Sequence, residues 1–133
     1  MGELINKIYN WYTFTRKYAV TVGKNVHLNG KIRNHGMGHI EIGDNVGINS
    51  GAKYNPTAGD GETHFRVWGK AKLVITSGAG LSNVSITARE YVEIGERATI
   101  GAGVMIADLD FHSIYKDKRM DPTDYGECAV FIA

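Results

Sequence analysis

The sequence has one cysteine, two prolines and almost no excess of charge, and each scarcity excludes something. The lone Cys128 cannot form a disulfide within the chain, so a reducing cytoplasm fits best. Fifteen basic against fourteen acidic residues give a net charge of +1, which lacks the basic footprint expected of a protein that binds nucleic acid or an anionic membrane. No apolar run is long enough for a signal segment or a membrane span.

Glycine, by contrast, is abundant. The 133 residues fit one domain, and 43% hydrophobic content is enough for a modest core. The 17 glycines show no strict three-residue period, which excludes a collagen-like segment and indicates many tight turns instead.

The first 18 residues differ from the rest of the chain. Apolar residues recur there at roughly helical spacing: Leu4, Ile5, Ile8, Trp11, Tyr12 and Phe14. This pattern predicts a short amphipathic helix over residues 1–18. We expect it to cover one open end of the main domain. A membrane-surface position is the alternative, but three basic residues are too few to favour it.

A seven-residue pattern recurs four times along the chain. The copies begin at Val22, Ile42, Ile75 and Ile94, which lie 20, 33 and 19 residues apart. Each copy has aliphatic residues at its first and seventh positions, a polar or turn-forming pair at its third and fourth, and a small apolar residue at its fifth. Such self-similarity is typical of a solenoid, in which each repeat packs only on its neighbours.

The chemistry of the pattern predicts strands joined by corners. The fifth and seventh residues of each copy share one face of an extended strand, so we expect both to point inward. The pair before them suits a corner where the backbone bends sharply or enters the left-handed region. Three sides of about six residues make a coil of about eighteen, as in a parallel β-helix built from hexapeptides.

The segments "IGDNVGI" and "IGERATIGAGVMI" resemble the hexapeptide repeats of left-handed parallel β-helix acyltransferases. The segments "GLSNVSI" and "DLDFHSI" narrow the resemblance to sugar O-acetyltransferases similar to those of polysaccharide gene clusters, over about residues 22–133. It implies an all-β, left-handed parallel β-helix over residues 19–133 after the short N-terminal helix. Glycine, proline and charged residues predict loops at about 49–66 and 112–129.

The resemblance also implies an activity. Enzymes of this family transfer an acetyl group from acetyl-CoA to a sugar hydroxyl without a tightly bound cofactor, and they assemble as homotrimers. His112 stands where the family has its general base, and a neutral imidazole can accept a hydroxyl proton. Asp110 is the carboxylate expected to orient that ring. The other reading of His112 is a loop-entry histidine held by local hydrogen bonds.

Three further residues are candidates for substrate binding. Asn83 stands about one coil before His112, so stacking of coils could bring it near the same groove, where its amide could bind an acceptor hydroxyl. The alternative is an internal asparagine that bonds to backbone at a corner. Asp108 either contacts substrate or caps a turn. Arg89 either faces the groove or belongs to a solvated surface.

A metal site is the weaker hypothesis for the segment from Asp108 to His112. Two carboxylates and an imidazole at alternate positions share a face of an extended strand, but no further ligand cluster accompanies them, so we expect no metal. The "HGMGH" segment at 35–39 is interpreted as a loop for the same reason.

The end of the chain departs from the family pattern. Val130 and Ile132 alternate as inward residues of a new strand, where the family continues with coils that line the acetyl-CoA site between subunits. We therefore expect an acetyltransferase lacking most of its CoA-binding coils. A non-catalytic solenoid that serves as a structural or binding module is the alternative.

Overall fold

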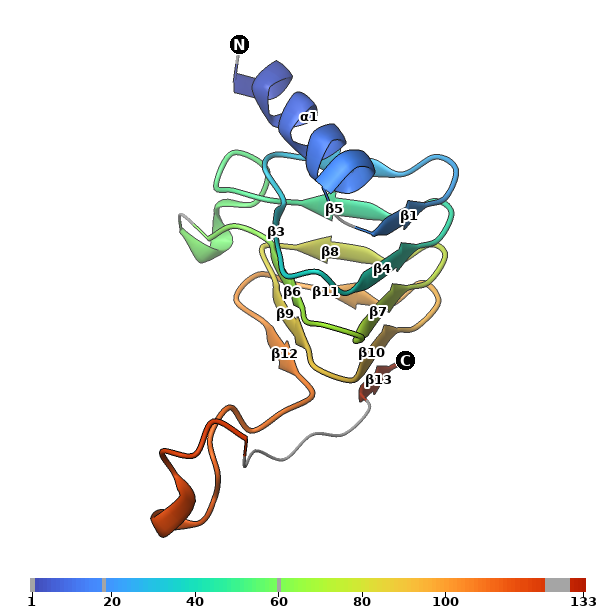
Figure 1. Cartoon of the computed structure of the whole chain (residues 1–133). Coiled ribbons are helices and arrows are strands. Elements are labelled where there is room, and N and C mark those ends of the chain that lie inside the picture. The colour runs from blue at the N-terminus through green and yellow to red at the C-terminus, as the bar shows by residue number, and fades with distance from the viewer. Residues whose placement is uncertain (1, 18, 60, 124–129) are drawn as a thin grey trace.

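The computed structural model describes residues 2–17, 19–59, 61–123 and 130–133. Most of this part of the chain is β, in three parallel sheets of stacked short strands with one short helix at the N-terminus (Figure 1). Successive strands along the chain belong to successive sheets, so the backbone winds around a central core and returns to each sheet once per coil. This is the arrangement of a parallel β-solenoid.

The first sheet contains β1 (Val20–Val22), β4 (His39–Ile42), β7 (Lys72–Ile75), β10 (Tyr91–Ile94) and β13 (Val130–Ile132). The second contains β2 (His27–Asn29), β5 (Gly47–Asn49), β8 (Gly80–Ser82) and β11 (Thr99–Ile100). The third contains β3 (Arg33–His35), β6 (His64–Val67), β9 (Ser85–Ala88) and β12 (Met105–Ala107). The helical segments are α1 (Gly2–Tyr12), the π-helical turn η1 (Thr13–Lys17), and the 3-10 turns η2 (Pro56–Ala58) and η3 (Lys116–Lys118).

The pairing of the strands confirms the repeat predicted from the sequence. Residues at the first position of each copy are direct partners in the first sheet: Val22 with Ile42, Ile42 with Ile75, and Ile75 with Ile94. Residues at the seventh position pair in the same way in the second sheet: Leu28, Ile48, Leu81 and Ile100. Each repeat therefore spans the corner between these two sheets.

The core is the column of aliphatic side chains inside the coils. Ile40, Leu73 and Val92 are partners in the first sheet and all three are buried, as are Ile48 and Ile86 in the other two sheets. Burial of apolar area stabilises the fold by about 25 cal/mol per Å². The parallel ladders also satisfy the backbone hydrogen-bonding groups of each strand. Consecutive coils are therefore held together by apolar burial and by backbone hydrogen bonds.

The corner between the first and second sheets adopts the left-handed conformation that the sequence indicated. The fourth residue of each repeat has a positive φ: 54° at Asn25, 57° at Asn45, 78° at Gly78 and 59° at Arg97. Asparagine and glycine are the residues that tolerate this region best. The side-chain amide of Asn25 donates to that of Asn45 over 2.9 Å, which links the first two corners.

The loops differ in part from their predicted limits. The first was expected over 49–66, but it ends before His64, because Phe65 and Val67 alternate inward and form β6 on the third sheet. The second was expected over 112–129; residues 112–123 are irregular apart from η3, and residues 124–129, with Cys128, lie outside the described residues. The strand expected at Val130 and Ile132 is confirmed as β13, paired with β10.

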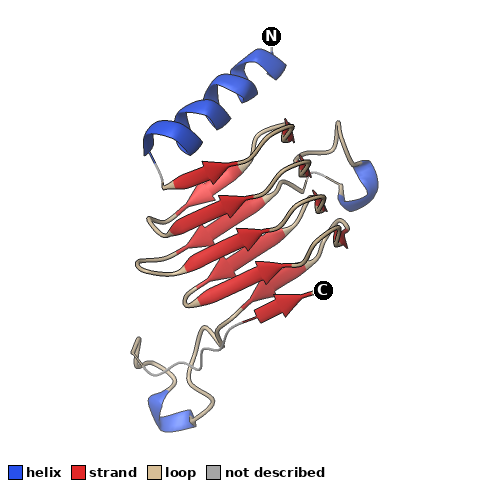
Figure 2. Ribbon diagram, turned by 90° about the vertical axis from the view of Figure 1, so that its right-hand side faces the viewer, coloured by secondary structure: helices blue, strands red, loops and turns tan. Residues whose placement is uncertain are grey.

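The helix α1 lies across the end of the solenoid that begins with β1 (Figure 2). Asn10 attaches it there, since its amide donates to Gly30 O over 2.8 Å and accepts from Ile32 N over 3.1 Å. Phe14 follows in η1 and enters the core. In the described part of the chain no helix has the length and apolarity needed to cross a membrane.

Candidate functional site

The corner after the third sheet brings two side chains from successive coils together. Trp68 follows β6, and Arg89 follows β9 one coil later. Trp68 N donates to Ala88 O over 3.1 Å, so the two corners stack, and the Arg89 guanidinium carbon lies 4.8 Å from the centre of the Trp68 ring. This geometry is a cation–π contact on a partly exposed aromatic ring.

Asp108 is the anchor of the next corner in the stack. Its side chain is only 1% exposed, and its carboxylate accepts three backbone N–H groups: from Arg89 over 2.7 Å, and from Glu90 and Tyr91 over 2.8 Å each. One buried carboxylate thus satisfies the donors of a whole turn. Asp108 fixes both the corner that carries Arg89 and the point where the chain leaves the coil.

A pocket of about 250 Å³ lies between these corners and the exit loop that follows Asp108. Its lining consists of Trp68, Arg89, Leu109, Phe111, His112, Arg119, Met120, Asp121 and Pro122. The coil supplies an aromatic ring and a guanidinium, and the loop supplies the imidazole of His112, which is exposed. Phe111 turns the loop at this place, with a φ of 54°.

The charges around the pocket are mixed. Arg89 and Arg119 line it together with Asp121. The side-chain hydroxyl of Thr123 donates to Asp121 over 2.6 Å and its backbone N–H over 2.9 Å, and both bonds lower the pKa of that carboxyl. Asp121 is therefore ionised near neutral pH, and it balances one of the two arginines.

Of the residues predicted from the sequence, the pocket brings Arg89 and His112 together, with Asp108 beneath them. Asp110 is exposed and does not line the pocket. Its backbone carbonyl accepts from His112 N–H, but within the described chain no hydrogen bond joins its carboxylate to the imidazole. The orienting role expected of Asp110 stays a prediction.

Asn83 lies at a corner away from the pocket. It is buried with a φ of 51°, its Oδ1 accepts from Gly51 N over 2.8 Å and its Nδ2 donates to Asn55 O over 2.7 Å. Gly103 N donates to Asn83 O, so the stacking partner one coil later is residue 103 and not His112. Of the two readings of Asn83, these contacts are those of an asparagine that bonds to backbone at a corner, and Asn83 does not line the pocket of His112.

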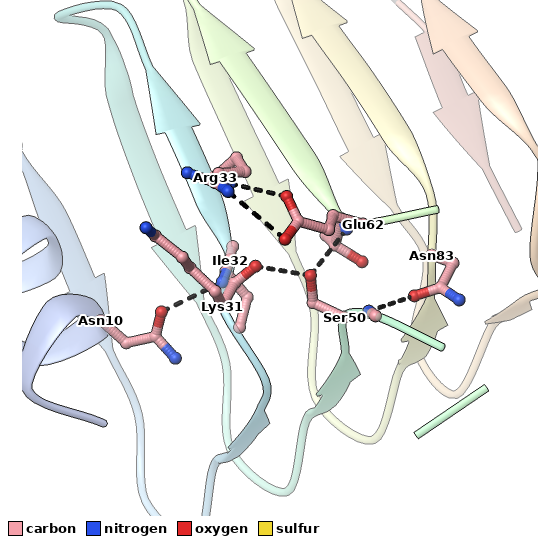
Figure 3. A network of polar contacts seen from close by, with 9 residues as sticks. Asn10, Lys31, Ile32, Arg33, Ser50, Glu62 and Asn83 are labelled. Atoms are coloured by element: carbon pink, nitrogen blue, oxygen red, sulfur yellow. Dashed lines mark hydrogen bonds and ion pairs between the residues drawn. The ribbon is translucent and has the colours of Figure 1, made fainter. Parts of the chain in front are cut away.

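Asn83 belongs to a structural network that holds the first loop against the coils (Figure 3). Ser50 Oγ donates to Lys31 O over 2.5 Å and accepts from Thr63 N over 2.9 Å. Arg33 and Glu62 form an ion pair of 2.6 Å beside it. Both ends of the loop are thereby tied to neighbouring corners.

The histidines of the third sheet form a pair that the sequence did not indicate. The rings of His35 and His64 stack with centroids 5.7 Å apart and an angle of 7°. Burial lowers the pKa of His64, and the nearby charge of His35 lowers it further. Across the described residues, no group of three or more His, Cys, Asp or Glu side chains is placed to hold a metal ion.

Trp68 and Arg119 were not found by sequence reasoning. A signal for Trp68 existed, because it stands 21 residues before Arg89, about one coil, and directly after an alternating strand. Only the corner between the first two sheets carries the seven-residue sequence pattern, so the sequence does not align the strands of the third sheet with one another. Arg119 reaches the pocket from the loop, where no periodicity applies.

Comparison of the chain with protein-family models, with curated proteins and with solved structures gives no match. The fold and the pocket define the class: a three-sided parallel β-solenoid with a polar and aromatic pocket where the exit loop leaves the coil.

Proposed function

We propose that this protein is an acetyltransferase of the hexapeptide-repeat type, with a left-handed coil, which transfers an acetyl group from acetyl-CoA to a sugar hydroxyl. One observation carries the proposal: His112 lies in the same pocket as Trp68 and Arg89, at the place where the coil opens into a loop. The sequence resemblance of the segment around His112 supports the same reading.

The residues of the pocket suit the parts of such a reaction. His112, as a neutral imidazole, takes the proton from the sugar hydroxyl while that oxygen attacks the thioester carbon. The tetrahedral intermediate expels the thiolate of CoA, which receives the proton from the imidazolium. Trp68 offers an aromatic face to a sugar ring, and Arg89 offers N–H donors to its oxygens.

The remaining parts of the proposal come from the resemblance. Asp110 would orient His112 after the exit loop rearranges, since its carboxylate is exposed in this structure. Acetyl-CoA would bind between the coils of neighbouring subunits of a homotrimer. The cytoplasm, where acetyl-CoA is made and used, suits both the reaction and the single cysteine.

The test is release of free thiol from acetyl-CoA in the presence of a panel of saccharides. We expect His112→Ala to reduce the rate by about a hundredfold or more, the usual contribution of a general base. His27→Ala is the matched control, because His27 is also exposed but lies on β2, outside the pocket. Equal rates for the parent and His112→Ala would refute the proposal. The assay is run on the 133-residue chain and on one extended by further hexapeptide coils.

A saccharide-binding module without catalysis is the second candidate. It is favoured by the missing contact between Asp110 and the imidazole, since Trp68 and Arg89 would bind a sugar ring without a base. This alternative predicts that saccharide binding, measured by calorimetry, is lost in Trp68→Ala while no chain, extended or not, releases thiol from acetyl-CoA.

A further inference from the structure

The helix α1 turns its apolar face away from the solenoid. The side chains of this outer face are each 52–61% exposed: Leu4, Ile5, Ile8, Trp11 and Tyr12. Their spacing of three, four and seven residues puts them on one side of the helix. An amphipathic helix of a globular domain normally buries this side, so the exposed stripe indicates something that covers it.

The polar face of the same helix holds it in this orientation. Glu3 accepts from Lys53 over 2.6 Å and from the Tyr54 hydroxyl over 3.0 Å, and these contacts lower the pKa of its carboxyl. Asn10, at the other end of the same face, is buried and bonds to the backbone of the first coil. Turning the apolar face inward would break both attachments.

The position of the helix at the end of the stack lets a flat surface such as a membrane approach its outer face. Both views of the molecule show α1 at one extreme of the stack, with the exit loop at the other (Figures 1 and 2). A groove of about 460 Å³ beside the helix, lined in part by Trp11, Val22 and Val26, adds apolar surface at the same end. In both views no other described helix or strand lies on the outer side of α1.

The charges at this end are complementary to an anionic bilayer. Lys7 is exposed and lies one turn from both Leu4 and Trp11, where its chain can extend toward headgroups. The single acidic residue of the helix, Glu3, is paired with Lys53 over 2.6 Å, and in the sequence Arg16 and Lys17 follow the helix. Three basic residues alone are too few to favour a membrane surface, and it is the exposed apolar stripe of α1 beside Lys7 that adds the reason for one.

A second copy of the chain fits the face less well. A helix of 11 residues is about 16 Å long. One face of that length is smaller than the roughly 800 Å² per partner that a standard interface buries, so a second copy would also have to cover the groove beside the helix. Tryptophan and tyrosine next to aliphatic residues are also the side chains that favour the boundary between water and lipid.

We propose that the outer face of α1 binds the surface of an anionic phospholipid bilayer, with the helix in the plane of the membrane and the exit loop pointing away from it. Leu4, Ile5 and Ile8 enter the acyl region, Trp11 and Tyr12 lie at the boundary, and Lys7 contacts headgroups. This proposal does not depend on the proposed activity.

The test is co-sedimentation of the full chain with vesicles of phosphatidylcholine and phosphatidylglycerol in equal parts, with pure phosphatidylcholine for comparison. We expect binding that is stronger with the anionic lipid and weakened by salt. The double variant Leu4→Ser with Ile8→Ser should lower the partition coefficient by at least a hundredfold, because burial of each aliphatic side chain contributes roughly tenfold. The control, Ile114→Ser with Met120→Ser, removes two more exposed apolar residues at the opposite end and should leave binding unchanged.

A second measurement does not rely on altering the helix. In a Trp68→Phe background Trp11 is the only tryptophan, and its fluorescence should shift to the blue and be quenched by brominated lipid when vesicles are added. An unchanged spectrum, or equal vesicle binding by the two double variants, would overturn the proposal. A third result would also overturn it: the parent forms an oligomer without lipid and does not bind vesicles, and the Leu4→Ser, Ile8→Ser variant is monomeric. The outer face of α1 would then be covered by a second copy of the chain.

Discussion

Residues of the same type are buried in the coils and exposed in the exit loop. Asp108 is buried and accepts three backbone N–H groups, whereas Asp110, two residues later, is exposed. Phe65 in the third sheet is fully buried, whereas Phe111 in the loop is 45% exposed with a positive φ. In the coil these polar and aromatic side chains are buried and stabilise the fold. In the loop the side chains of the same types are exposed and available to a ligand.

This difference separates residues that hold the site from residues that form it. Mutations in the coil should change the free energy of unfolding, and mutations in the loop should change binding or rate without changing stability. Trp68 and Arg89 are the points where the two regions meet, since they belong to coil corners and line the pocket.

The largest contrast is expected between the two phenylalanines. Phe65→Ala removes a fully buried ring and should cost about 3–5 kcal/mol of unfolding free energy, because the core cannot close the cavity. Phe111→Ala should change stability by less than about 0.5 kcal/mol, as for an exposed position. Urea denaturation of both variants measures the two changes in unfolding free energy. Equal losses would contradict the difference between coil and loop.

The two aspartates give the next contrast. Asp108→Ala leaves three N–H groups of the corner without an acceptor and should cost about 3 kcal/mol. Asp110→Ala should be close to neutral in the same denaturation experiment. A loss at Asp110 as large as that at Asp108 would show that the loop is packed as the coil is.

Asn83 tests how firmly the first loop is tied to the coil. Asn83→Ala removes both amide bonds and places alanine at a φ of 51°, so a loss of about 2 kcal/mol is expected. Asn83→Gly loses the same bonds but tolerates the backbone conformation, so it should be less destabilising than Asn83→Ala. If both variants lose equally, conformation contributes nothing at this corner.

The smallest expected effect is the change of stability with pH that comes from His64 in the third sheet. Burial and the charge of His35 depress the pKa of His64 in the folded state below its ordinary value of about 6.5, so folding favours the neutral ring. Its contribution is fully present above about pH 6.5 and is lost as the pH falls through the depressed value. Thermal unfolding between pH 7 and pH 5 should show a smaller decline in His64→Phe than in the parent. His27→Phe, at an exposed site, should keep the parent's decline.

Much of the solenoid was predictable from the sequence because its inward residues repeat. The direct pairing of Val22, Ile42, Ile75 and Ile94 follows from one repeated corner, and so does the left-handed backbone at Asn25 and Asn45. The corner that leads into the third sheet repeats in conformation, with positive φ at Gly30, Asn83 and Gly103, but not in the seven-residue sequence pattern. That is why β6 was predicted as part of a loop.

The site was predictable only where it touches the repeat. His112 was predicted from its place at the end of the hexapeptide run and from the family resemblance, and Arg89 was one of two readings of a polar segment. The loop residues Phe111 and Arg119 obey no period. The orientation of α1 was also beyond the sequence. Its apolar stripe predicts a helix, but only the contacts of Glu3 and Asn10 show which side packs on the domain.

Amide hydrogen exchange, followed residue by residue on the unmodified chain, tests the division between coil and loop most directly. The amides of Arg89, Glu90 and Tyr91, which donate to the buried Asp108 carboxylate, should exchange as slowly as those of β9 and β10. The amides of Phe111 and Ile114, only a few residues beyond Asp108, should exchange orders of magnitude faster. Equal protection on both sides of Asp108 would contradict the account.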